Sequence, residues 1–139
     1  MKHVILYAEN EDVDLMICER AFKKHEDAYR LRGVVDGRSV IEWLDGRGSY
    51  ANRAFFPLPQ IVVIDSKLGD MSGLDVLHWI RSQRDFRELP VVLYYSSMSP
   101  EQIQEYNRAG VSACVEKDSK CERLLECLQS ILAGEPAYR

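Results

Sequence analysis

Short runs of consecutive apolar residues alternate along the chain with longer segments in which apolar residues recur every three or four positions. The central run, residues 61–64, is apolar throughout, a pattern typical of a strand buried on both faces of a sheet. The other predicted strands cover residues 4–8, 29–35, 91–95 and 113–116. Strands of this kind predict a parallel sheet with helices on both faces.

After every predicted strand, apolar residues recur with the spacing of a helix. A first helix is predicted through residues 13–21. Four later helices are predicted to start at a serine: Ser39, Ser72, Ser99 and Ser119. Ser39 pairs with Glu42 and Ser119 with Glu122 in the pattern of a capping box, and Ser99 is followed by Pro100 and pairs with Gln102. Five strands that alternate with five helices predict an α/β fold, a doubly wound parallel sheet of flavodoxin-like topology with strand order 2-1-3-4-5. We expect a single domain over residues 1–134 and a C-terminal tail at 135–139.

Composition and charge narrow the functional classes. The 139 residues are 46% apolar and 29% charged with a net charge of −4, which fits a globular domain and argues against general binding to nucleic acid or a membrane surface. No apolar run approaches the ~20 residues of a membrane span, and the N-terminal run is too short for a signal peptide, so a cytoplasmic location is expected. The cysteines lack the paired spacing of a zinc site and are interpreted as buried thiols: Cys18, Cys114, Cys121 and Cys127.

Polar residues suited to binding a cation or a phosphoryl group follow three of the predicted strands. Glu9 and Asn10 follow the first strand, Asp65 the third and Lys117 the fifth. The predicted strand order brings the carboxyl ends of these strands to one rim of the sheet. Clustered acidic oxygens suit Mg²⁺, a carboxylate can act as a nucleophile, and an ammonium neutralises charge on a transferring phosphoryl group. Each residue alone is more often a turn residue or a solvated lysine, but together they favour a phosphoryl-transfer site.

With these motifs in place, the sequence resembles the receiver domains of two-component response regulators over almost its whole length. The matching segments are the acidic loop at residues 9–12, residues 63–73 around Asp65, residues 89–93 and residues 109–117. A further segment, Tyr50-Ala51 to Pro57-Leu58-Pro59, resembles a narrower group of stand-alone, chemotaxis-regulator-like receivers.

The resemblance implies that Asp65 accepts a phosphoryl group from a histidine kinase or a histidine phosphotransfer protein. It also implies Mg²⁺ held by Asp65, by Glu9 and Asn10, and by the backbone carbonyl of Lys67, with Lys117 contacting the phosphoryl group. A protein of this kind is a signalling receiver rather than an enzyme.

The acidic loop departs from the family pattern. Asn10 stands where the family usually has a second acidic residue that binds the metal, and an amide offers only a neutral carbonyl oxygen. Mg²⁺ binding is therefore expected to be weak unless Glu11 or Asp12 contributes. Asp12 is more simply interpreted as the start of a helix, where the helix dipole favours an acid, and the role of Glu11 is left open.

The positions that respond to the phosphoryl group also differ. Tyr95 stands where the family has a short hydroxyl, and Ser96 supplies one only if the strand end shifts, because neighbouring strand residues face opposite sides. Cys114 occupies the aromatic switch position, and Asp118 replaces the proline that usually follows the lysine. Lys67 either reaches over the pocket and replaces part of the metal's charge or remains solvated.

Two classes of function remain. The first is a phosphorylatable receiver that signals through contacts with an unknown downstream protein. The second is a pseudo-receiver, a binding module that keeps the fold and Asp65 but signals without phosphorylation. A flavodoxin fits poorly because the acidic loop would repel a phosphate, and a phosphatase of the haloacid dehalogenase type needs an aspartate where Lys67 stands.

Overall fold

The computed structural model describes residues 2–134, so the predicted tail at residues 135–139 lies outside the described residues. Parallel strands form one sheet in the order β2-β1-β3-β4-β5, which confirms the predicted flavodoxin-like fold. The strands are β1 (His3–Ala8), β2 (Tyr29–Val34), β3 (Ile61–Ile64), β4 (Val91–Tyr95) and β5 (Ala113–Glu116). The α-helices are α1 (Asp12–Lys23), α2 (Gly37–Asp45), α3 (Gly73–Ser82), α4 (Pro100–Arg108) and α5 (Glu122–Leu132), and two short 3₁₀ helices are η1 (Gly48–Ala51) and η2 (Arg84–Phe86).

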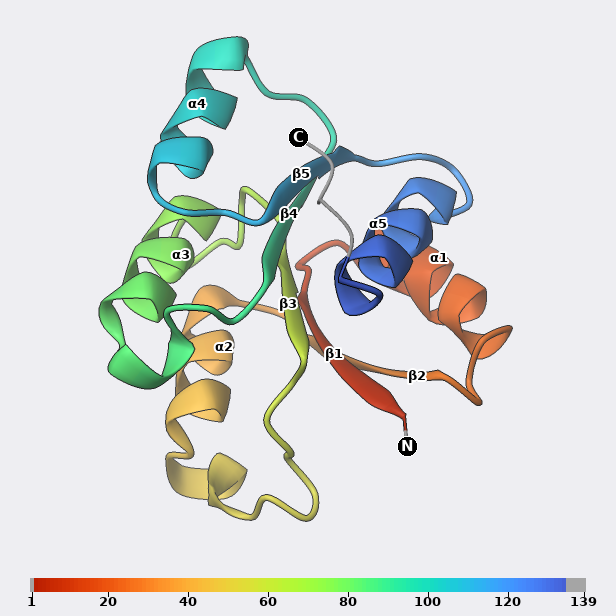
Figure 1. The fold of residues 1–139 in the computed structure, drawn as a ribbon, viewed down its shortest axis with the longest axis vertical. Helices are drawn as coiled ribbons and strands as arrows, with labels where there is room; N and C mark the ends of the chain where they lie inside the picture. The colour runs from red at the N-terminus through yellow and green to blue at the C-terminus, as the bar shows by residue number, and fades with distance from the viewer. Residues whose placement is uncertain (1, 135–139) are drawn as a thin grey trace.

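The helices form a layer on each face of the sheet. Helices α1 and α5 cover one face, and α2, α3 and α4 cover the other (Figure 1). Strand β3 lies at the centre and is fully buried: Ile61 and Val63 pack in the core with α1 and α5, and Val62 and Ile64 in the core with α2, α3 and α4. Within residues 2–134, no helix is both long and apolar enough to cross a bilayer.

Helices α3 and α4 begin where the sequence predicts. The Ser72 hydroxyl accepts a hydrogen bond from the Asp75 amide, and the Ser99 hydroxyl accepts one from the Gln102 amide, each within a reciprocal capping box. Gly110 follows α4 with φ of 95°, a left-handed conformation that glycine adopts without steric cost.

The starts predicted for α2 and α5 are wrong. Helix α2 begins earlier, at Gly37, because the Asp36 carboxylate accepts a hydrogen bond of 2.9 Å from the Ser39 amide. Helix α5 begins at Glu122, whose amide donates to the Asp118 carboxylate at 3.0 Å, so Ser119 does not cap it. In both places an aspartate upstream of the predicted serine satisfies an otherwise unpaired amide of the first turn.

The ladder between strands continues for one residue past several strand ends and aligns the loops that follow. The Glu9 amide donates to the Val34 carbonyl, the Asp65 amide to the Ala8 carbonyl, and the Lys117 amide to the Tyr95 carbonyl. These bonds hold Glu9, Asp65 and Lys117 at the same edge of the sheet.

Candidate functional site

Asp65 is fixed at the carboxyl end of β3 by two different contacts. Its side chain is largely buried, and the Ser66 amide donates to Oδ1 at 2.6 Å. The ammonium of Lys117 donates to Oδ2 at 3.3 Å. One carboxylate oxygen is therefore held by backbone, and the other faces a positive charge.

Lys117 is at the centre of a network that joins the loops after β1, β3 and β5 to helix α1. Its ammonium donates to Glu9 Oε1 at 2.8 Å and to Asp14 Oδ2 at 2.8 Å, in addition to Asp65. Burial alone lowers the pKa of this amine, but the hydrogen bonds to Asp14 and Glu9 and the charge of Asp65 outweigh burial and raise it. Lys117 thus stays charged, and all its N–H donors have carboxylate partners. We call Glu9, Asp14, Asp65 and Lys117 the lysine cluster.

Glu9 is the most deeply buried carboxylate of the lysine cluster, with 1% of its surface exposed. The buried Tyr7 hydroxyl donates to Oε1 at 2.6 Å, and the Glu11 amide donates to Oε2 at 3.2 Å. Burial raises the pKa of Glu9, although the bonds from Lys117 and Tyr7 oppose this effect. Both oxygens of Glu9 are thus engaged by protein donors.

Asp14 belongs to the cluster although the sequence analysis did not identify it. It lies on α1 four positions before Cys18, on the stripe that buries Cys18, Ala21 and Phe22 against the sheet. An acidic residue on the buried stripe of an amphipathic helix is a signal in the sequence that could have pointed to Asp14. Asp12, in contrast, is the exposed first residue of α1, as predicted.

The other predicted metal and phosphoryl contacts lie farther out. Asn10, Lys67 and Ser96 are exposed, and within residues 2–134 no side-chain hydrogen bond joins them to Asp65. A Cβ added to Gly69 would lie 3.9 Å from Asn10 Nδ2, which places Asn10 against the loop that follows Asp65. Glu11 is also exposed and contributes its amide, not its carboxylate, to Glu9.

The donor set suits a weakly held hard cation. The described residues contain no cluster of three or more His, Cys, Asp or Glu side chains arranged for a metal ion. Mg²⁺ does not require such a cluster, because it keeps several waters and takes one or two carboxylates. The lysine cluster has one ammonium and three carboxylates, a formal charge of −2 when all are ionised, which attracts a cation.

The two predicted switch positions lie on the face of the sheet that α4 covers. Tyr95, the last residue of β4, is half-buried and packs on the same core as the buried Cys114 of β5. Tyr94 faces the opposite side, where its ring lies edge-on to Tyr7 with centroids 6.1 Å apart. The structure therefore brings Tyr95 and Cys114 to one face, apart from the lysine cluster.

Tyr106 of α4 is buried near the site, and the sequence analysis did not identify it. Its Oη lies 3.0 Å from the position that a Cβ on Gly73 would take, and the same Cβ would collide with the Asp65 carbonyl. Burial raises the pKa of Tyr106 to about 12. Tyr106 therefore anchors α4 beside the start of α3, next to the backbone of Asp65.

Comparison with known proteins agrees with this geometry. The sequence matches the response regulator receiver domain family over residues 5–129. The response regulator Rcp1 of Synechocystis is 24% identical over 128 residues, a match that covers 92% of this chain and 85% of Rcp1.

Two solved structures share the fold over nearly the whole chain. The response regulator RPA3017 in red light signalling of R. palustris has a TM-score of 0.81 and 28% identity, and the match covers 93% of this chain and 90% of that one. The bacteriophytochrome response regulator AtBRR has a TM-score of 0.78 and 29% identity over 93% of this chain and 91% of that one. With the family match spanning most of the sequence and Asp65 and Lys117 in place at the strand ends, this chain belongs to the response regulator receiver domain family.

Proposed function

We propose that this protein is a phosphorylatable receiver, in which Asp65 accepts a phosphoryl group from a histidine kinase or a histidine phosphotransfer protein. The observation that carries the proposal is the contact between Asp65 Oδ2 and the Lys117 ammonium, within a buried cluster at the rim of the sheet. The receiver comprises residues 1–134 and signals in the cytoplasm through contacts with a downstream protein.

The proposed reaction uses the two oxygens of Asp65 differently. Oδ1 stays bonded to the Ser66 amide, which fixes the orientation of the carboxylate. Oδ2 attacks phosphorus, the phosphorus–nitrogen bond of the donor phosphohistidine breaks, and an acyl phosphate forms on Asp65. Lys117 is already adjacent to Oδ2 and neutralises charge on the incoming phosphoryl oxygens.

Receiver domains generally bind a divalent cation, and the residues here fit Mg²⁺ in the kind of oxygen that they offer. Asp65, the Asn10 amide oxygen and the Lys67 carbonyl would hold the ion. When bound, Mg²⁺ supplies positive charge at the transferring phosphoryl group. Asp65 is the only carboxylate in this set, and its two oxygens already accept hydrogen bonds from the Ser66 amide and from Lys117, so we expect weak binding.

A pseudo-receiver is the second candidate, and specific observations favour it. Both oxygens of Glu9 are engaged by protein donors, and Asn10 contributes no charge. Tyr95 also replaces the short hydroxyl that the family pattern has at the end of β4. In this case Asp65 and Lys117 would serve as a structural ion pair, and partner contacts alone would carry the signal.

Several similar proteins suggest which donor to test first. RPA3017 is described as acting in red light signalling, and AtBRR as a bacteriophytochrome response regulator. A histidine kinase of the phytochrome type is therefore the first candidate donor. The net charge of −4 argues against nucleic acid or a membrane as the receiving partner.

Incubation with Mg²⁺ and acetyl phosphate, followed by intact-mass analysis, tests the proposal. We expect the wild-type protein to gain the mass of one phosphoryl group and Asp65→Asn to gain none. Asp12→Asn, which removes an exposed acid from the same rim, is the matched control and should be labelled normally. Absence of labelling in the wild type under conditions that label another receiver would favour the pseudo-receiver, and undiminished labelling of Asp65→Asn would remove Asp65 from its role.

A further inference from the structure

Two buried cysteines from distant parts of the sequence lie in contact. Cys18 of α1 and Cys121, the residue that precedes α5, have sulfur atoms 2.8 Å apart although they are 103 positions apart in the chain. Both thiols are essentially inaccessible to solvent. No disulfide links cysteines within the described part of the chain. A disulfide has a sulfur–sulfur distance of about 2.05 Å, so only a small approach separates this pair from a covalent bond.

Cys121 has a backbone conformation that few residues adopt. Its φ is 60° in the left-handed region, and within residues 2–134 it is the only residue other than glycine with positive φ. Such conformations are disfavoured for a residue with a Cβ and persist only where the surroundings hold them. The contact with Cys18 and the burial of the thiol provide such surroundings, so the local backbone and the pair are parts of the same arrangement.

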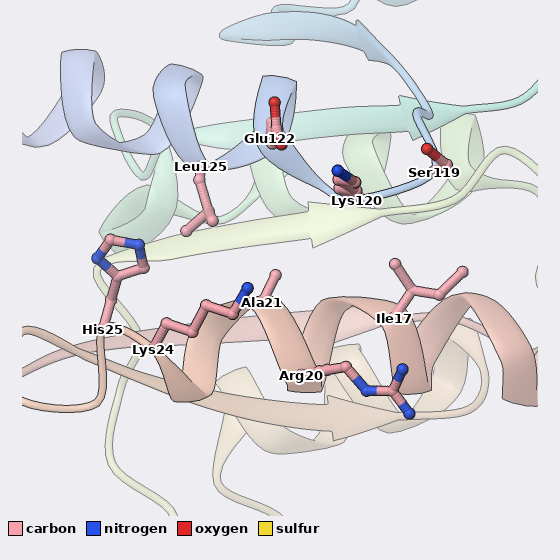
Figure 2. A pocket seen from close by; sticks show the side chains of 9 residues that line it. All are labelled: Ile17, Arg20, Ala21, Lys24, His25, Ser119, Lys120, Glu122 and Leu125. Carbon is pink, nitrogen blue, oxygen red and sulfur yellow. The ribbon is translucent and has the colours of Figure 1, made fainter.

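A cavity lies beside the two chain segments that carry the pair. It has a volume of about 460 Å³ and lies between α1 and the start of α5 (Figure 2). Ile17, Lys120 and Glu122, the sequence neighbours of the two cysteines, line this cavity. Figure 2 shows the basic Arg20, Lys24 and Lys120 around the cavity together with the acidic Glu122. The contact with Cys121 and burial raise the pKa of the Cys18 thiol, so oxidation of the pair is expected to be slow.

The pair also adjoins the buried hydrogen bonds of the lysine cluster. Tyr7 and Tyr94 pack in the same core as Cys18 and Cys121. The Tyr7 hydroxyl donates to Glu9, which in turn accepts from Lys117. A covalent change at the pair would therefore occur beside the residues that position Lys117.

We propose that Cys18 and Cys121 are an oxidisable dithiol, which a small hydroperoxide converts to a disulfide that joins α1 to the start of α5. One thiolate attacks a peroxide oxygen, the oxygen–oxygen bond breaks, and a sulfenic acid forms with release of water after proton transfer. The second sulfur then attacks the sulfenic sulfur and displaces another water. The pair loses two protons and two electrons, and hydrogen peroxide is reduced to two molecules of water. The proposal holds whether or not Asp65 is phosphorylated.

Peptide mapping of the native full-length protein after hydrogen peroxide treatment tests the proposal. Remaining thiols are alkylated after denaturation, and we expect a linked pair of peptides that contains Cys18 and Cys121, formed slowly because both thiols are buried. Dithiothreitol should reverse the link. Absence of this linked pair after prolonged exposure, or a predominance of another cysteine pairing, would overturn the proposal.

Cysteine variants distinguish the effect of the Cys18–Cys121 disulfide on stability from the effect of oxidation at other residues. The urea midpoint of the wild type should rise after peroxide treatment, because a disulfide between residues so far apart constrains the unfolded chain. Cys127→Ala keeps the pair and should show the same rise. Cys18→Ala should show none, which controls for methionine oxidation, and an equal rise in Cys18→Ala would contradict the assignment.

Discussion

The lysine cluster and the face formed by Tyr95, Cys114 and α4 lie at the same end of the sheet but differ in how their side chains are held. In the lysine cluster, hydrogen bonds of 2.6–3.3 Å fix Glu9, Asp65 and Lys117. On the other face, Tyr95 and Cys114 pack on an apolar core.

The difference separates two tasks that a receiver must perform. Acceptance of a phosphoryl group needs a fixed carboxylate next to positive charge, and the lysine cluster provides both. A response to that group needs an element with two arrangements that the phosphoryl group stabilises unequally. The family's hydroxyl and aromatic switch positions carry this task, and both positions differ here. We infer that the two tasks are uncoupled to an unusual degree in this chain, and the following predictions test that inference.

The largest expected effect follows from removing the charge that holds the lysine cluster together. Lys117→Met leaves Glu9 and Asp65 as uncompensated buried carboxylates, so we expect the free energy of unfolding to fall by about 3 kcal/mol. Urea denaturation measures this change. Lys120→Met removes an exposed lysine from the same loop and should change the free energy of unfolding by less than about 0.5 kcal/mol.

The raised pKa of Lys117 predicts how the loss of stability in Lys117→Met depends on pH. The folded-state pKa lies above the ordinary value of 10.5, so the stabilisation is complete below pH 10.5 and is lost as the pH rises through the folded-state value. The difference in stability between wild type and Lys117→Met should therefore stay constant from about pH 7 to about pH 9. A penalty that disappears within this range would contradict the assignment of the ammonium as the stabilising group.

The second prediction concerns the metal. Asn10→Asp adds a carboxylate beside the loop that follows Asp65, so we expect Mg²⁺ to bind about tenfold more tightly, equivalent to about 1.4 kcal/mol. Isothermal titration of the metal-stripped protein measures the affinity. Asn52→Asp, which adds the same charge at an exposed distant position, should leave the affinity unchanged. Tight binding in the wild type that Asn10→Asp does not alter would defeat this account of the acidic loop.

The third prediction concerns Asp14, which contacts Lys117 more closely than Asp65 does, at 2.8 Å against 3.3 Å. Asp14→Asn removes a negative charge from the site and leaves Lys117 with fewer competing partners. We expect beryllofluoride, a phosphoryl mimic, to bind about threefold more tightly at saturating Mg²⁺, a modest change because Asp14 is partly exposed.

Two measurements on Asp14 distinguish electrostatic tuning from a structural defect. The stability of Asp14→Asn should fall slightly while its affinity for beryllofluoride rises, whereas a merely damaged fold would weaken both. Asp12→Asn, on the same helix but exposed, should change neither by a comparable amount. A loss of beryllofluoride affinity in Asp14→Asn would show instead that Asp14 supports binding.

The sequence predicts the fold and part of the lysine cluster because these depend on local patterns. Each buried run specifies a strand, and the strand order then brings together the residues that directly follow the strands, Glu9, Asp65 and Lys117. Asp14 was not predicted because its role depends on which side of α1 faces Lys117, more than a hundred positions away in the chain.

Other features depend on competition between neighbouring groups or on distant pairing. The starts of α2 and α5 were misplaced because Asp36 and Asp118 cap their first turns in preference to the predicted serines. The contact of Cys18 with Cys121 depends on how α1 and α5 pack side by side, and neither spacing nor composition specifies that geometry. The residues that directly follow the strands were therefore more predictable from the sequence than contacts that depend on how the helices pack.

The smallest expected effect is on the face formed by α4, β5 and α5, which we expect to be largely preset. Ser96 is exposed, while Tyr95 fills space at the end of β4 and Cys114 leaves room for it. Tyr106 anchors α4 beside Gly73. A phosphoryl group shifts a two-state element only if it interacts more favourably with one state than with the other. The contacts of Tyr95, Cys114 and Tyr106 give the phosphoryl group little reason to favour either state.

Amide chemical shifts recorded with and without beryllofluoride measure this directly. We expect changes confined to the loops around Asp65 and Lys117, with small changes elsewhere across residues 99–128. Tyr95→Thr restores a short hydroxyl at the end of β4, and in that variant we expect the changes to extend into α4, because the hydroxyl gives the phosphoryl group a contact that depends on the position of the β4–α4 loop. Asp85→Asn, at an exposed position on η2, is the control and should behave like the wild type. Large changes across α4 and α5 in the wild type would show that Ser96 or another group already couples the two regions, and the separation of acceptance from response would then be wrong.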